Sequence, residues 1–294
     1  MKNNKALGQV SFLIKLLTDR DEFVRSRVQE QLIDLGEDAL PFLEIAVRGG
    51  DDDLRIQANA VIQSILPQKL AEKFRQLAQK GLGQDIDLET GMMLIMEFGY
   101  PNSDPEEFRQ KLDKLAQNFS DILNPEAEPP EIVAAFTHFL FQQKGFKGNK
   151  DDYQNPDNSF LNKVLDNQTG LPITLSAICV LLAKRLHLPI VGVGMPGHYI
   201  VKYSLPIEPI YFDPFHQGRL LTKKECIQIV EQFGHSFEEH FLSQATQRET
   251  LIRMLNNLIQ VYKKSNETKK AETLTKYIKI LLNPSKDQQS ERIH

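Results

Sequence analysis

Apolar residues in the first 80 positions recur at helical spacing, and the same arrangement occurs twice. Residues 21–35 (DEFVRSRVQEQLIDL) align without gaps with residues 51–65 (DDDLRIQANAVIQSI) at an offset of 30. In both copies apolar side chains follow one another at intervals of three or four, and acidic residues open the segment, where a helix dipole favours negative charge. Between the copies, residues 37–50 (EDALPFLEIAVRGG) predict a helix that ends at a pair of glycines. We therefore expect a repeated helix pair.

Both copies carry the motif Asp-x-x-(Val/Leu)-Arg, which begins at Asp21 and at Asp51. A repeated helix pair with this motif resembles HEAT repeats. The offset is shorter than the roughly 40 residues usual for that family, and two copies make a short array, so a generic helical bundle stays open as the alternative. The resemblance implies packing or partner binding, because stacked helix pairs bury a shared face.

Helical spacing continues as far as residue 145, with Asp or Pro at the predicted starts and Pro or Gly near the ends. The predicted helices cover residues 87–101, 104–119 and 130–145. Residues 145–158 (GFKGNKDDYQNPDN) are rich in Gly, Asn, Asp and Pro, which predicts a loop that borders a site or links two domains. A short helix over 159–167 and a longer one over 172–187 follow. The longer helix is apolar on almost every side and should be buried.

The period then changes to that of strands. Short runs rich in β-branched and aromatic residues, separated by Pro and Gly, predict strands over 190–194, 198–203 and 209–213. Helical spacing returns over 222–234 and in a final pair over 246–263 and 267–282. The last ten residues are polar, and we expect them to fray.

Composition and charge narrow the class of protein. A chain of 294 residues suggests about two domains. The net charge of -4 gives no basic footprint, which argues against nucleic-acid partners. No membrane span is predicted, because no run approaches the roughly 18 apolar residues that cross a bilayer. No signal peptide is predicted, because Lys15 interrupts the first apolar stretch and no small-residue cleavage site follows. Two cysteines without metal-type spacing suit a reducing compartment, so we expect a cytoplasmic protein.

The candidate chemistry centres on His198. If residues 204–207 (Ser-Leu-Pro-Ile) close a hairpin between two predicted strands, residue 203 lies opposite residue 208, and the same register sets His198 opposite Asp213. A carboxylate beside an imidazole can fix its tautomer and stabilise its charged form, as in catalytic triads. The spacing therefore predicts a base and its orienting acid.

Several motifs around this pair resemble the SirB-type transglutaminase-like proteins, and an F-box protein carries a similar domain. The resemblance covers about 86–225 and rests on Asn158-Ser159, Gly170-Leu171-Pro172, Pro196-Gly197-His198 and Asp213-Pro214, in that order. Residues 253–284 resemble the tetratricopeptide-like helical pair that ends these proteins. The resemblance implies a papain-like α+β core, in which a cysteine at the start of a buried helix attacks an amide and His and Asp on adjacent strands activate it.

This sequence departs from the family's enzymes at the nucleophile. The cysteine's place falls near Ile173, and Cys179 lies about two turns farther into an apolar helix, where burial would leave it inert. Thr174 and Ser176 are hydroxyl candidates that His198 could activate in principle. Capping of the helix start explains these two residues at least as well.

Weaker candidates complete the predicted site. Asn158, Pro196 and His216 are expected to line a cleft beside the pair, although a solvated turn explains His216 better. The spacing of His235 and His240 resembles a metal site only loosely, so no metal is expected. No phosphate-binding glycine loop occurs, and no cofactor is expected.

Together these observations predict an α+β, mostly α fold. The expected domains are HEAT-like repeats over 1–82, a transglutaminase-like core with a small antiparallel sheet over 83–240, and a tetratricopeptide-like helical hairpin with a frayed tail over 241–294. The expected function is that of a non-catalytic regulatory or interaction protein of the SirB type, with a protein or peptide partner. The alternative is an amidase, protease or acyl transferase that uses Ser176 or Thr174 with His198 and Asp213.

Overall fold

The computed structural model describes the backbone of residues 2–283 and the side chains of residues 9–283. The chain forms two compact units, which divide between Lys73 and Phe74. Among the described residues, no helix has an apolar stretch long enough to cross a membrane. The predicted frayed tail, the last ten residues, lies outside the described residues.

The first unit is helical, as the repeated spacing predicts. Its helices are α1 (Lys2–Lys15), α2 (Glu22–Leu35), α3 (Leu40–Gly49) and the first part of α4 (Asp52–Lys80). Asp21 caps α2 by accepting a hydrogen bond from the backbone N–H of Phe23. Val28 and Leu32 of α2 are buried in one core with Ala58 and Ile65 of α4. The apolar positions of the two copies thus meet in a shared core.

Helix α4 is longer than the predicted segment 51–65. It continues through Pro67 to Lys80. Leu70, Phe74 and Leu77 are buried beyond the proline, so apolar residues keep the helical period there and favour continuation of the helix.

The second unit begins with helices and ends with helices. The first group is α5 (Leu88–Gly99), α6 (Pro105–Ser120), α7 (Pro129–Thr137) and α8 (Leu161–Asn167). The last group is α10 (Lys223–Gln232), α11 (Gln247–Lys264) and α12 (Thr268–Leu282). Asp87 and Asp104 cap α5 and α6 through backbone N–H groups. The predicted helix over 130–145 ends in a π-helical turn, His138–Gln143.

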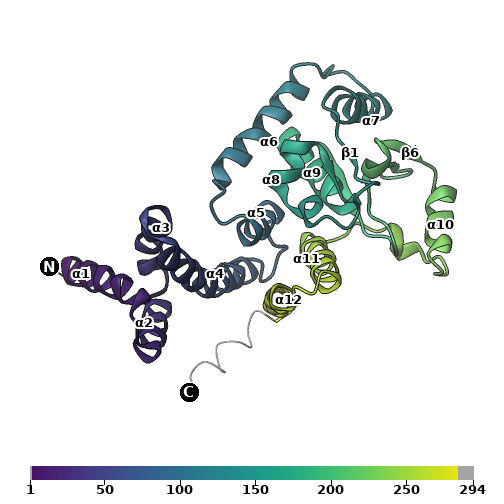
Figure 1. The fold of residues 1–294 in the computed structure, drawn as a ribbon. Helices are drawn as coiled ribbons and strands as arrows, with labels where there is room; N and C mark the ends of the chain where they lie inside the picture. Colours follow the sequence, from purple (N-terminus) through teal and green to yellow (C-terminus); the bar gives the residue numbers. More distant parts are fainter. Residues whose placement is uncertain (1, 284–294) are drawn as a thin grey trace. The chain divides into compact units, whose positions relative to one another are not determined.

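The centre of this unit is a small antiparallel sheet packed on α9 (Pro172–Leu186). The strands are β3 (Ile190–Val193), β4 (Ile200–Tyr203), β5 (Ile210–Asp213) and β6 (Arg219–Leu221), in that spatial order. Helix α9 packs against β3 and β4 (Figure 1). It is buried along most of its length, as predicted. The α+β, mostly α fold is confirmed.

The C-terminal hairpin of α11 and α12 belongs to the same compact unit. Helix α11 contacts α5 and α9, and α12 packs along α11 (yellow in Figure 1). The ring of Phe74 stacks on Tyr277 of α12, with centroids 4.6 Å apart. The predicted boundaries at residues 82 and 240 stay predictions.

The predicted register of the β4–β5 hairpin is wrong by two residues. Tyr203 lies opposite Ile210, and Lys202 lies opposite Tyr211. The connection therefore spans 204–209 instead of 204–207. Side chains alternate between the faces of a strand with a period of two, so a shift of two leaves each side chain on its expected face.

Three short strands were not predicted. Strand β6 follows a tight turn after β5, and β1 (Lys147–Gly148) pairs in parallel with β2 (Thr169–Gly170). Runs of two or three residues are too short to show a period in the sequence. The β1–β2 pair joins the predicted loop 145–158 to the segment that leads into α9.

Candidate functional site

A tight turn sets the position of His198. The backbone N–H of His198 donates to the carbonyl of Met195 at 3.3 Å, and Gly197 has a φ of +74°. Proline followed by a glycine with positive φ is the residue pair that favours a type II turn. A Cβ atom on Gly197 would lie 2.0 Å from the ring of Phe233. Both backbone and packing therefore require glycine here.

The contact expected between His198 and Asp213 is present. Nε2 of His198 lies 2.7 Å from Oδ2 of Asp213, and Nδ1 of His216 lies 2.8 Å from the same oxygen. The other oxygen, Oδ1, accepts hydrogen bonds from the backbone N–H groups of Phe215 and His216. Asp213 thus joins two imidazoles, of which His198 is nearly buried and His216 is exposed. The catalytic role of the pair stays a prediction.

The environment of Asp213 favours its charged form. Burial alone would raise the pKa of this carboxyl group, but hydrogen bonds and charge from His198 and His216 outweigh burial and lower it. The second histidine reaches Asp213 because Pro214, Phe215 and His216 form a 3₁₀ turn directly after β5. The sequence signal for this contact was the three-residue spacing across Asp213-Pro214.

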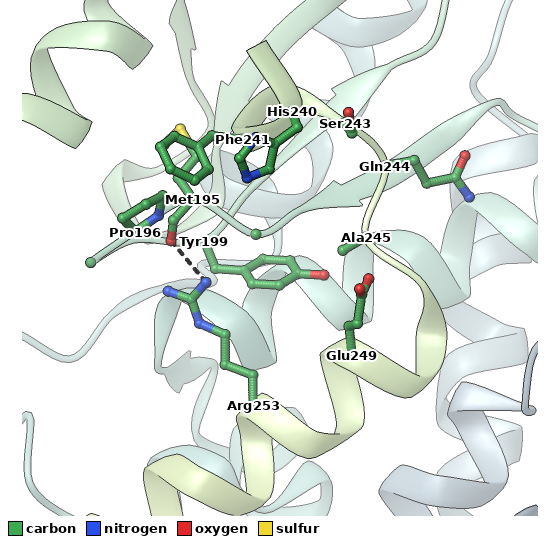
Figure 2. Close-up of a pocket in the computed structure, with 12 residues that line it drawn as sticks. Met195, Pro196, Tyr199, His240, Phe241, Ser243, Gln244, Ala245, Glu249 and Arg253 are labelled. Atoms are coloured by element: carbon green, nitrogen blue, oxygen red, sulfur yellow. Dashed lines mark hydrogen bonds between the residues drawn. The ribbon is translucent and has the colours of Figure 1, made fainter. Parts of the chain in front are cut away.

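Arg253 of α11 supports the turn from a distant part of the sequence. Its guanidinium donates to the carbonyl of Met195 at 2.8 Å (Figure 2) and to the carbonyl of His198 at 3.0 Å. Burial lowers the pKa of Arg253. Its separation of 55 residues from His198 explains why sequence reasoning missed this contact.

The start of α9 offers no nucleophile to His198. Ile173 is only 2% exposed, and Pro172 occupies the first turn. The hydroxyl of Ser176 contacts the carbonyl of Tyr199 at 3.5 Å, and that of Thr174 is buried without a hydrogen-bond partner among the described residues. Neither hydroxyl therefore makes the bond to His198 that activation requires.

Cys179 is buried inside α9, as predicted. Burial raises the pKa of its thiol strongly. Burial also raises the pKa of Cys226, to about 11. Neither cysteine has the exposed, electropositive surroundings of a reactive thiolate.

A cavity of about 560 Å³ lies beside the turn, and we call it the Arg253 pocket. It is bordered by residues 194–197, Tyr199, residues 240–241 and 243–245, Glu249 and Arg253. Figure 2 shows Glu249 and Arg253 rising from α11, with Met195, Pro196 and Phe241 gathered around the other end. Pro196 therefore lines a cavity, whereas the imidazole of His198 lies outside this lining.

Asn158 lies at the end of the loop 145–158 and is held by hydrogen bonds within it. Its side chain is buried, its amide N–H donates to the carbonyl of Asp152 at 2.7 Å, and its Oδ1 accepts from Asn149 at 2.9 Å. These contacts stabilise the loop, and the cleft-lining role of Asn158 stays a prediction.

Comparison with known proteins identifies the relatives of this chain. The model of the transglutaminase-like superfamily matches residues 106–256, just over half of the chain. A UPF0162 protein of Xylella fastidiosa (strain 9a5c) is 33% identical over 198 residues, which cover 64% of this chain and 69% of the relative. F-box only protein 21 of Mus musculus is 30% identical over 142 residues, or 46% of this chain and 22% of that protein. No solved structure gives a significant match. The matched region includes His198, Asp213 and Arg253, and the chain belongs to the transglutaminase-like superfamily.

Proposed function

We propose that this chain is a non-catalytic transglutaminase-like protein that acts by binding a protein or peptide. The observation that carries the proposal is the apolar start of α9. The family resemblance sets the nucleophile near Ile173, and this side chain is buried and has no nucleophilic atom. The imidazole and its carboxylate thus have no attacking group to serve.

The Arg253 pocket supports a binding role. Its volume of about 560 Å³ falls within the range of small-ligand sites and can take one or two side chains of a peptide. Glu249 and Arg253 offer charges of both signs, and Tyr199 and Phe241 offer apolar surface. This mixture of groups suits the backbone and side chains of a peptide.

The finer parts of the proposal rest on resemblance. The helix pair of the first unit is proposed as a HEAT-like partner surface, and α11 with α12 as a tetratricopeptide-like pair. A regulatory role of the SirB type and a cytoplasmic location belong to the same proposal. The two cysteines are free and buried, which suits a reducing compartment.

The hydrolase alternative needs a hydroxyl oxygen about 2.6–3.2 Å from a nitrogen of His198. Ser176 is directed to the carbonyl of Tyr199 instead, and Thr174 is fully buried. An enzyme of this kind would require α9 and the turn to rearrange before reaction.

Covalent probes test the proposal directly. Folded protein is treated with a fluorophosphonate, which labels activated hydroxyls, and with iodoacetamide, which labels thiolates. At neutral pH we expect neither probe to label Ser176, Thr174 or Cys179 in the folded protein. After unfolding in urea we expect iodoacetamide to label Cys179, because burial in the folded protein protects this thiol. Labelling of Ser176 or Thr174 that disappears in His198→Ala would overturn the proposal in favour of the hydrolase.

The binding part has its own test. A photo-crosslinking residue replaces Gln244, which lines the Arg253 pocket, and in a matched variant it replaces Gln260, which is exposed elsewhere on α11. We expect crosslinks to a discrete protein or peptide in cells from position 244 and not from position 260. Equal yields at both positions, or none at either, would contradict peptide binding at the pocket.

A further inference from the structure

We propose that His198, Asp213 and His216 bind a divalent transition-metal ion of the Zn²⁺ type. The three side chains offer one ligand atom each, and these atoms all lie within 4.8 Å of one another. Two imidazoles and one carboxylate form a donor set that Zn²⁺ and related ions accept. The site is independent of the proposed peptide binding, because it lies outside the Arg253 pocket and needs no partner protein.

The ligand atoms are close together and have to shift to surround an ion. Oδ2 of Asp213 lies 2.7 Å from His198 and 2.8 Å from His216. Atoms bound tetrahedrally to one zinc ion at about 2.0–2.1 Å are roughly 3.3 Å apart. Oδ2 therefore has to move about 0.5–0.6 Å away from each imidazole nitrogen. The two imidazole nitrogens, which lie within 4.8 Å of one another, have to come to about 3.3 Å.

Metal binding changes where the protons of His198 and His216 lie. In the metal-free arrangement each histidine nitrogen that faces Asp213 donates its N–H to the carboxylate. When the ion binds, the nitrogen that faces Asp213 loses this proton, either to the other nitrogen of the same ring or, where that nitrogen already carries a proton, to solvent. The freed lone pair then binds the metal. In the metal-bound form each imidazole is neutral and the carboxylate is charged, which are the forms that bind metals.

The surroundings already hold the ligands in place. Backbone N–H groups of Phe215 and His216 fix Oδ1 of Asp213, which directs Oδ2 toward the histidines. Arg253 fixes the carbonyl of His198 and thereby the turn that carries this side chain. Such outer contacts orient the ligands of metal sites and raise affinity.

One side of the cluster is open. The side chain of His216 is 45% exposed, whereas that of Asp213 is 3% exposed. An ion can therefore enter past His216, and water can supply the fourth ligand, as in open zinc sites. The sequence already predicted His198 opposite Asp213 and His216 beside them, but it predicted no metal, because ligands 15 and 3 residues apart match no metal motif.

The test is titration of metal-free full-length protein with ZnCl₂ at pH 7.5, followed by calorimetry and by competition with a chromophoric chelator. We expect one ion per chain. We also expect His216→Ala to weaken binding at least 10-fold, since loss of even an outer contact costs about that much. Because His216 is exposed, this variant should fold, and circular dichroism checks it.

The matched control is His235→Ala, which removes an exposed histidine outside the cluster and should leave affinity unchanged. Substitution of Co²⁺ gives a second readout, because its visible absorption reports the ligand set and should be lost in His216→Ala. Absence of Zn²⁺ binding to the wild type would overturn the proposal. Equal affinity of the wild type and His216→Ala, or a loss on removal of His235, would overturn it as well.

Discussion

Asp213 holds the candidate site together through four hydrogen bonds. Two come from the side chains of His198 and His216, and two come from backbone N–H groups of the turn that follows β5. Burial without these donors would raise the pKa of the carboxyl group, and with them it is lowered. The charged carboxylate of Asp213 therefore stabilises the local fold, whether or not the site carries out chemistry.

Asp213→Asn should destabilise the protein at pH 7 by about 1–3 kcal/mol, because hydrogen bonds to a charged acceptor are lost in a buried place. The lowered pKa means that Asp213 contributes stability above its unfolded pKa of about 3.9, and that this contribution is lost as the pH falls through the folded pKa. The difference between wild type and variant should therefore shrink in acid.

Urea unfolding from pH 7 down to pH 3 measures both effects. The control is Asp166→Asn, which removes an exposed carboxylate paired with Lys111 and should cost about 1 kcal/mol or less. If the free energy of unfolding changes with pH in the same way for the wild type and for Asp213→Asn, the carboxylate is not coupled to the histidines as described.

The turn of residues 195–198 connects the sheet to the Arg253 pocket. Met195 and His198 offer their carbonyls to Arg253, while the side chain of His198 reaches Asp213. Gly197 allows this arrangement because it adopts a positive φ against the ring of Phe233.

Gly197→Ala should therefore destabilise the protein by about 1–3 kcal/mol, through backbone strain and displacement of the Phe233 ring. The double variant Gly197→Ala/Phe233→Ala should recover the part that is due to the ring. Thermal unfolding compares the two variants. NMR shifts of the His198 ring test whether the turn moves with them, and unchanged stability in Gly197→Ala would show that the turn tolerates a side chain.

Local signals in the sequence were enough to place most elements. Pro172 and the apolar run after it predicted a helix over 172–187, and the observed α9 spans Pro172–Leu186. The pairing of β4 with β5 was less well determined, because Ile207 to Pro209 could have belonged to a strand or to the connection. The predicted contact of His198 with Asp213 is still present, because a register shift of two residues leaves both side chains on the expected face of the sheet.

The rest of the site depends on contacts that have no local signal. Arg253 has the sequence surroundings of any surface arginine on an amphipathic helix, and only the packing of α11 brings it to Met195 and His198. The Arg253 pocket was missed for the same reason, since its walls come from residues 194–199 and 240–253. Tertiary packing, which no short window contains, determines such a site.

The division into two units indicates which part of the chain is needed to form the site. The candidate residues and the Arg253 pocket all lie in the unit that begins at Phe74. The α11–α12 hairpin belongs to this unit and supplies both Glu249 and Arg253. Its second helix is held by Phe74, which stacks on Tyr277. The final turns of α4 are thus part of the structure that supports the site.

A fragment of residues 70–294 should therefore fold by itself, whereas a fragment of residues 82–294 should be less stable. The shorter fragment lacks Phe74, and removal of a buried phenylalanine ring costs about 3–5 kcal/mol. For a chain of this size that loss corresponds to a fall in Tm of roughly 6–20 °C.

Phe74→Ala within the fragment 70–294 is the matched control, since it removes the ring and keeps the helix. Scanning calorimetry should show one transition for the longer fragment and a lowered Tm for this variant, close to that of the shorter fragment. If the fragment 70–294 fails to unfold cooperatively, the second unit needs the first for its stability. If the variant keeps the Tm of its parent, the stacking of Phe74 on Tyr277 does not anchor the C-terminal hairpin. Either result would show that the end of α4 is not what stabilises the unit that carries the site.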